Sequence, residues 1–187
     1  QRAILVERAP MTGDRSARVL AEILGSLHNV RHKALYINGN YQVDTLYTPV
    51  YYDETVYLAL MSHPNPEKVL VIGCGDGGLL RAILADPRVK RLDQVEIDSD
   101  IIRLCRTHMP EINERLGVSV WEDPRVRLHI DDGRRFLARS AESYSMIVCD
   151  LPGPLEEATS MFYSREFYRL VKSHLEKDGV FWTESES

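Results

Sequence analysis

The chain has 187 residues, a formal net charge of −5 and 44% hydrophobic residues. This composition is typical of a globular protein and excludes a disordered, collagen-like or coiled-coil chain. No apolar run approaches the roughly 18 residues that a transmembrane helix needs, and the acidic balance disfavours nucleic acid, so we expect neither a membrane nor a nucleic-acid partner. No basic segment followed by an apolar one marks a signal peptide, and we expect a cytoplasmic protein.

Residues 1–52 predict a small N-terminal β domain. Residues 1–7 have the composition of a strand, and residues 17–27 that of a short helix or a loop. Two apolar runs at 34–37 and 41–43 are separated by Asn38-Gly39-Asn40. Asn-Gly between apolar runs is the strongest short signal for a β-hairpin, so we predict a hairpin over residues 33–43.

Residues 53–187 predict a second domain in which strands and helices alternate. A helix is expected at 53–62, ended by the prolines at 64 and 66. Strands are then predicted at 69–72, 92–97, 125–130, 146–149 and 180–183, and helices at 79–85, 99–108, 134–139 and 164–175, the last with Ser164 as its N-cap. Residues 109–122 are expected to be an irregular insertion.

This alternation predicts an α/β fold, with a mainly parallel Rossmann-like sheet of the class I methyltransferase type and helices on both faces. The small β-hairpin domain precedes it. A sheet that ended with the strand at 180–183 would have an uncovered edge, so we expect the natural protein to continue beyond Ser187.

A glycine-rich loop follows the first strand of this domain and precedes a helix. Gly73, Gly75 and Gly78 satisfy the pattern G-x-G-x-x-G, and Glu96 follows 18 residues after the third glycine, at the end of the next strand. Such a carboxylate accepts hydrogen bonds from ribose hydroxyls, so the pattern predicts a nucleoside cofactor. The alternative ribose ligand is Asp98, which we expect to cap the next helix. A dinucleotide and an S-adenosyl sulfonium fit equally well.

Two further acids follow predicted strands. Asp150 ends the fourth strand and Asp132 follows the third. Because ligands of open α/β sheets lie at the carboxyl ends of the strands, both are expected beside the cofactor. Asp132 could accept a hydrogen bond from an adenine amino group; the alternative for each acid is a helix cap or turn.

The sequence predicts no metal site. The three cysteines, at positions 74, 105 and 149, include no C-x-x-C pair, and no H-E-x-x-H motif is present. We expect three reduced thiols.

Taken together, these segments resemble the polyamine aminopropyltransferases, the spermidine synthase family. The resemblance extends over nearly the whole chain. Its most specific parts are the segment DPRV at 123–126 and the helical segment YSREFYRL at 163–170. These two favour this family over generic methyltransferases.

The resemblance implies transfer of an aminopropyl group from decarboxylated S-adenosylmethionine to an amine, with release of methylthioadenosine. It also implies a homodimer. Matched residue by residue, Asp150 is the catalytic acid and Tyr57 contacts the acceptor amine. The implied donor-binding residues are Gln42, Gly73, Gly75, Asp76, Gly77, Gly78, Glu96, Asp132 and Gly133. Asp76 would lie near the aminopropyl tail of the donor, and Tyr51 and Tyr52 are further aromatic residues that could face a cation.

Two departures from the family pattern predict an altered acceptor pocket. After the tyrosine the family usually reads His-Glu, where this chain has Leu58-Ala59, and a second acid of the family loop is Gly153 here. The alternatives are an S-adenosylmethionine-dependent methyltransferase and a non-catalytic relative that keeps only the nucleoside site.

Overall fold

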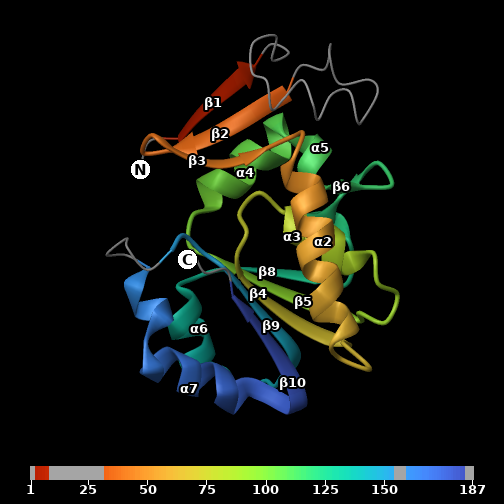
Figure 1. The fold of residues 1–187 in the computed structure, drawn as a ribbon, viewed down its shortest axis with the longest axis vertical. Coiled ribbons are helices and arrows are strands. Elements are labelled where there is room, and N and C mark those ends of the chain that lie inside the picture. Colours follow the sequence, from red (N-terminus) through yellow and green to blue (C-terminus); the bar gives the residue numbers. More distant parts are fainter. Residues whose placement is uncertain (1–2, 9–31, 154–158, 184–187) are drawn as a thin grey trace. The chain divides into compact units, whose positions relative to one another are not determined.

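The computed structural model describes residues 3–8, 32–153 and 159–183 (Figure 1). The chain divides into two compact units, residues 1–50 and 51–187. The helix or loop predicted at 17–27 lies outside the described residues. No helix in the described ranges is long and apolar enough to cross a membrane.

The first unit contains a three-stranded antiparallel sheet. Its strands are β1 (Ala3–Arg8), β2 (His32–Ile37) and β3 (Asn40–Asp44), paired in the order β1-β2-β3. Asn38 and Gly39 form the turn between β2 and β3, with φ angles of 51° and 87°. Two consecutive left-handed residues are what a tight hairpin turn requires, which is why Asn-Gly occurs there. The predicted hairpin is confirmed.

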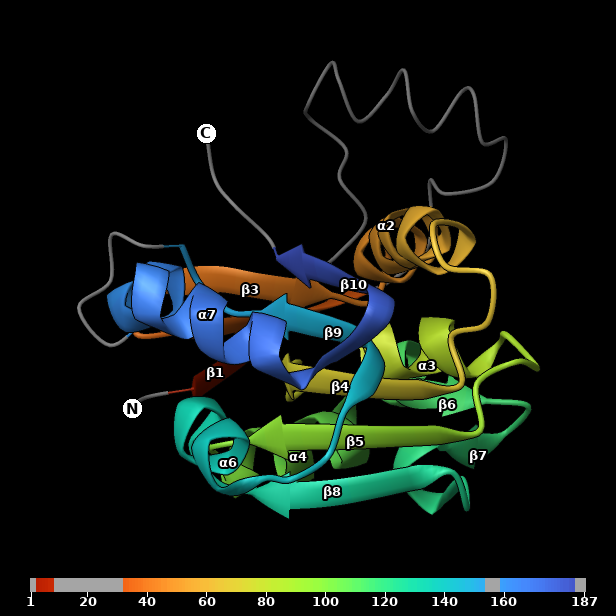
Figure 2. The same cartoon turned by 90° about the horizontal axis from the view of Figure 1, so that it is seen from below.

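The second unit is built on a five-stranded parallel sheet. Its strands are β4 (Lys68–Gly73), β5 (Arg91–Glu96), β8 (Val126–Ile130), β9 (Tyr144–Asp150) and β10 (Leu175–Thr183). They are arranged in the order β10-β9-β4-β5-β8, and every neighbouring pair is parallel (Figure 2). The predicted Rossmann-like sheet is confirmed.

Helices cover both faces of this sheet, as predicted. They are α2 (Thr48–Met61), α3 (Gly78–Leu84), α4 (Ser99–His108), α6 (Gly133–Arg139) and α7 (Arg165–His174). The Ser164 hydroxyl caps α7 by accepting a hydrogen bond from the Phe167 amide. Helix α2 begins five residues earlier than predicted, at Thr48-Pro49. Proline suits a first helical turn, because its fixed φ is helical and the missing N–H has no intrahelical partner there.

The segment 109–122 contains regular elements, so the prediction of an irregular insertion is wrong. It contains α5 (Pro110–Asn113), β6 (Glu114–Arg115), β7 (Val118–Ser119) and the 3₁₀ turn η2 (Val120–Glu122). A second 3₁₀ turn, η3 (Ser160–Tyr163), precedes α7. Elements of two to four residues are too short to show a periodic pattern. Ile112 and Val120 are buried, so packing holds the segment in place.

Alternate side chains of β4 point into two separate apolar layers. Val69 and Val71 pack with α2 and α3, whereas Leu70 and Ile72 pack with α6 and α7. Figure 1 shows these two helix pairs on opposite sides of the sheet. A strand covered on both faces needs a continuous apolar sequence, as β4 has.

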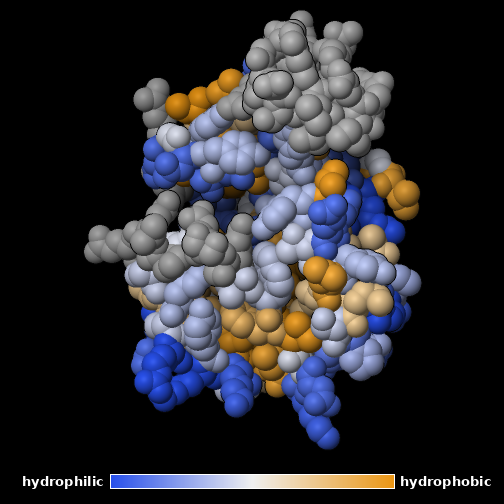
Figure 3. Space-filling model, viewed as in Figure 1, coloured by the Kyte–Doolittle hydropathy of each residue, from blue (hydrophilic) through white to orange (hydrophobic). Residues whose placement is uncertain are grey.

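Strand β10 lies at one edge of the sheet. It is longer than predicted, beginning at Leu175, and its register shifts between Leu175 and Val180. Figure 3 shows hydrophobic side chains gathered where β10 lies between α7 and α2. Val180, Phe181 and Trp182 are only partly buried there.

The strand order reverses between β4 and β9, which places the site. From β4 the chain continues to β5 and β8 on one side, while β9 and β10 lie on the other. Ligands of open α/β sheets bind at such a reversal, at the carboxyl ends of the strands. There Gly73 pairs with Asp150. A Cβ on Gly73 would lie 2.1 Å from the Asp150 carbonyl oxygen, so only glycine allows this approach.

Gly78 makes room for an aromatic ring rather than for open space. A Cβ on Gly78 would lie 2.4 Å from Cδ2 and 2.5 Å from Cε2 of Tyr52. Tyr52 belongs to α2 and is 4% exposed. The third glycine of the loop therefore lets α2 pack directly on the start of α3.

Gly78→Ala is expected to destabilise the fold by about 1–3 kcal/mol, because the added methyl group overpacks the Tyr52 ring. Urea unfolding measures the loss. Tyr52→Ala removes the ring, so the penalty of Gly78→Ala should largely disappear in the double variant. Penalties that add to within about 0.5 kcal/mol would show that the two residues do not compete for this space.

Candidate active site

The loop from Gly73 to Gly78 joins β4 to α3 with a strained backbone. Gly73, Cys74 and Gly77 have φ angles of 89°, 57° and 80°. A Cβ on Gly77 would collide with Trp121 and Asn113, and one on Gly75 would lie 2.8 Å from Ile101. The loop glycines are thus required by close packing on several sides.

A buried amide supports the loop from β5. Gln94 is fully buried, and its Nε2 donates to the carbonyl oxygens of Gly73 at 3.1 Å and Cys74 at 2.8 Å. Trp121 Nε1 in turn donates to Gln94 Oε1 at 2.6 Å. Sequence reasoning missed this pair. The available signal was a polar side chain within a strand predicted in the middle of an α/β sheet.

Asp76 is a buried carboxylate inside the glycine loop. It is 5% exposed, its Oδ1 accepts from the Gly78 amide at 2.7 Å, and its Oδ2 accepts from the Tyr52 hydroxyl at 3.1 Å. Burial raises the pKa of Asp76, opposed by these hydrogen bonds. Asp76 thus occupies an amide at the start of α3 that a phosphate oxygen would use in a dinucleotide site.

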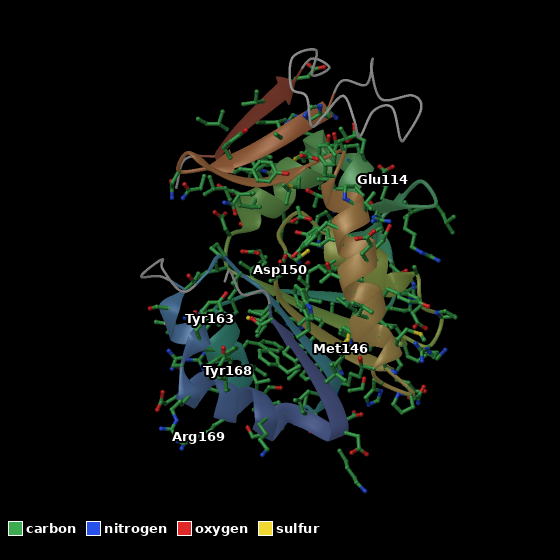
Figure 4. All side chains as sticks on the ribbon, in the orientation of Figure 1. Glu114, Met146, Asp150, Tyr163, Tyr168 and Arg169 are labelled. Atoms are coloured by element: carbon green, nitrogen blue, oxygen red, sulfur yellow. The ribbon has the colours of Figure 1, made fainter. Side chains whose placement is uncertain are left out.

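Asp150 reaches the same hydroxyl from the neighbouring strand. It lies at the carboxyl end of β9 (Figure 4), half-buried, and its Oδ2 is 3.3 Å from the Tyr52 hydroxyl oxygen. Burial, followed by the charges of Asp150 and Asp76, raises the pKa of Tyr52 well above that of a free phenol. Tyr52 therefore stays a neutral hydroxyl between two acids.

Glu96 faces the glycine loop from the end of β5. It is 9% exposed, and its Oε2 would lie 3.2 Å from a Cβ on Gly75. Its Oε1 accepts from the Asp98 amide at 2.9 Å, and burial raises its pKa. Asp98 caps α4 by accepting from the Asp100 amide, so its expected role as a cap is confirmed.

Asp132 and Gly133 begin α6 at the carboxyl end of β8. Asp132 caps the helix, its Oδ1 accepting from the Arg135 amide at 2.8 Å. A Cβ on Gly133 would lie 2.4 Å from Ile72 Cγ2, so this glycine permits close packing of α6 on the sheet. The cap predicted as the alternative for Asp132 is present. An adenine contact of Asp132 stays a prediction.

Two residues predicted on the acceptor side, Tyr57 and Leu58, are exposed rather than buried with these acids. Tyr57 lies on α2 with 61% of its surface exposed, and Leu58 is 70% exposed, while Ala59 is buried in the core. Gln42 lies on β3 in the first unit, and its Nε2 donates to the Tyr41 carbonyl oxygen. Tyr52, rather than Tyr57, is the tyrosine of α2 beside the acids.

Cys74, Asp76 and Asp150 approach one another closely. One ligand atom from each lies within 4.8 Å of the other two. Burial, followed by the charges of the two aspartates, raises the pKa of Cys74, which keeps it a neutral thiol. Zinc and similar ions bind cysteine as the thiolate. The expectation that the chain binds no metal stays a prediction.

Comparison with known proteins gives a consistent family. Residues 49–187 match the model of the spermine/spermidine synthase domain. A polyamine aminopropyltransferase of Bacillus subtilis is 34% identical over 153 residues, which are 82% of this chain and 53% of that protein. The chain thus spans about half the length of this curated relative.

Solved structures agree. A spermidine synthase in complex with the transition-state analogue AdoDATO superposes with a TM-score of 0.72 at 27% identity, covering 80% of this chain and 49% of that one. Human methyltransferase-like protein 13 in complex with SAH gives a TM-score of 0.54 at 25% identity, covering 70% and 62%. The matched domain includes the loop, Glu96, Tyr52 and Asp150, and the chain belongs to the spermine/spermidine synthase family.

Proposed function

We propose that this protein transfers an aminopropyl group from decarboxylated S-adenosylmethionine to a small-molecule amine. The observation that carries the proposal is the pair of carboxylates, Asp76 and Asp150, that meet at the hydroxyl of Tyr52 where the strand order reverses. Two acids at the mouth of a nucleoside-type loop suit a cationic ligand. The donor carries a sulfonium and an ammonium.

The same acids argue against a dinucleotide. A pyrophosphate needs free amide groups and a positive field at the start of the helix after the loop. In this loop the Gly78 amide already donates to Asp76, so it is not free for a phosphate oxygen. A donor with a positive charge beside Asp76 fits this loop better than the negative pyrophosphate of a dinucleotide.

The donor's nucleoside half is assigned to the remaining loop and strand ends. Glu96 would accept hydrogen bonds from the ribose, since it faces Gly75, where the missing side chain allows close approach. Asp132 and Gly133 would lie beside the adenine, and Gln42 is proposed as a donor-binding residue from the family resemblance alone. Asp76 would pair with the aminopropyl tail.

Asp150 would act as the general base. The amine nitrogen attacks the carbon next to the sulfonium, a C–N bond forms, and the C–S electron pair leaves with sulfur as neutral methylthioadenosine. A protonated amine has no lone pair, so its proton must first pass to an acceptor such as the half-buried Asp150 carboxylate. Because methylthioadenosine is a good leaving group, the remaining contribution of the protein is to align the amine with the carbon that it attacks.

The acceptor side is proposed to differ from the usual diamine pocket. The sequence predicts this difference from Leu58-Ala59 and Gly153, which replace polar residues of the family pattern. Leu58 and Tyr57 are, however, largely exposed on α2. Support now comes from Tyr52, whose phenol lies between the two carboxylates. We therefore propose Tyr52 in place of Tyr57 as the tyrosine beside the amine. A homodimer and a cytoplasmic location remain proposals from the family.

Methyl transfer is the second candidate, favoured by the similarity to the methyltransferase-like protein bound to SAH. Incubation with decarboxylated S-adenosylmethionine or S-adenosylmethionine and a panel of mono- and diamines separates the two. Aminopropylated amine and methylthioadenosine are expected. Methylated product would favour the second function, and binding without turnover would identify a non-catalytic relative.

Glu96→Gln is expected to weaken methylthioadenosine binding by about 1–3 kcal/mol, because a charged acceptor for the ribose hydroxyls is lost while the shape is kept. Calorimetric titration measures the change. Glu142→Gln is the matched control, since Glu142 pairs with Lys68 and Arg91 just before β9, at the opposite end of the sheet. Equal affinity of wild type and Glu96→Gln would remove Glu96 from the ribose site.

Asp150→Asn should lower the single-turnover rate of transfer by about 10²–10⁴-fold, the usual contribution of a general base. Affinity for neutral methylthioadenosine should change little, because the assigned nucleoside contacts lie elsewhere. Asp178→Asn serves as the control, because asparagine also accepts the left-handed backbone at Asp178 (φ 65°). A full rate in Asp150→Asn would require another base.

A further inference from the structure

One hydroxyl group serves two acids in this site. The Tyr52 oxygen lies 3.1 Å from Asp76 Oδ2 and 3.3 Å from Asp150 Oδ2. A phenol has a single hydrogen, so it can donate fully to only one of them. If both carboxylates are ionised, the other contact brings two oxygens together with no hydrogen between them.

One proton in addition to the phenol hydrogen removes this unfavourable oxygen–oxygen contact. With a proton on Asp76, its carboxyl group donates to the Tyr52 oxygen, and the Tyr52 hydroxyl donates to Asp150. Both short contacts are then hydrogen bonds, and one negative charge rather than two remains. Asp76 is the better holder of the proton because it is 5% exposed, whereas Asp150 is half-buried, and burial disfavours the charged form.

We propose that Tyr52 is a positioning residue that links Asp76 and Asp150 through its hydroxyl, and that this chain of three residues holds one more proton in the free protein than when a cationic nucleoside is bound. The proposal rests on the proposed function for the identity of the cation. A sulfonium or ammonium next to Asp76 replaces the proton as the partner of the carboxylate.

The other titratable groups around Asp76 are not expected to release this proton. Cys74 in the loop, Cys105 on α4 and Cys149 on β9 are buried thiols whose pKa values are raised, so they remain neutral. Glu96, at the end of β5, is a further acid coupled to this cluster by charge. Glu96 would face the ribose of any nucleoside, so its proton would leave equally with charged and neutral ligands.

Two ligands that differ in charge test the proposal on the wild-type protein. Decarboxylated S-adenosylmethionine is cationic and methylthioadenosine is neutral, while both share the nucleoside. Calorimetric titrations in buffers of different ionisation enthalpy give the number of protons released by each ligand. At a pH below the raised pKa of Asp76 we expect about one more proton with the cation, and its affinity should rise about tenfold per pH unit before levelling off.

Variants assign this proton to the three residues. In Tyr52→Phe the protonated chain loses two hydrogen bonds and the doubly ionised chain loses only one, so the pKa of Asp76 falls. The pH profile of cation affinity should therefore move down by about one unit. Asp76→Asn should abolish the extra proton release. Tyr144→Phe is the matched control, because the Tyr144 phenol is buried and donates to the Asp93 carboxylate outside the site.

The outcomes separate the two hypotheses. Equal proton release by both ligands in wild type, or an unmoved profile in Tyr52→Phe, overturns the inference and leaves the proposed function standing. If neither nucleoside binds, the proposed function fails and the inference fails with it. A profile that moves equally in Tyr144→Phe also overturns it, since the shift would then reflect general stability.

Discussion

The buried carboxylate of Asp76 is the constraint on which the rest of the site depends. A buried acid is costly unless hydrogen bonds satisfy its oxygens. Here the Gly78 amide and the Tyr52 hydroxyl are the partners of the two oxygens. Each requirement fixes a neighbour: Gly78 must lack a side chain so that the Tyr52 ring fits, and α2 must pack on the start of α3.

The loop around this carboxylate is held by groups that take no part in the proposed chemistry. Gln94 satisfies the carbonyl oxygens of Gly73 and Cys74, and Trp121 orients Gln94. Because these groups are desolvated, the loss of one partner leaves another unsatisfied. Trp121 belongs to η2, one of the short elements between residues 109 and 122, so these elements place its indole beside the loop.

Motifs that identify the family do not all belong to its chemistry. In the segment 123–126, Arg125 donates to Asp123 and to the carbonyl oxygens of Leu84 and Val89. Leu84 ends α3, so Arg125 satisfies an orphan carbonyl and holds the helix to the sheet. The segment 163–170 contains the capped start of α7. Both segments therefore have a structural role, one in hydrogen bonding and one in helix capping.

The sequence by itself determined the alternation of elements, the Asn38-Gly39 hairpin, the Ser164 cap and the glycine loop followed by Glu96, because these depend on residue types close together in the chain. Tertiary structure alone decided that Tyr52 rather than Tyr57 lies beside Asp150, and that Gln94 and Trp121 support the loop. Helix α2 is apolar around much of its surface, so its pattern does not show which tyrosine turns inward. Tyr52 packs inward because Gly78 has no side chain and leaves room for its ring. A local sequence pattern cannot show that Gly78 contacts a residue 26 positions earlier in the chain.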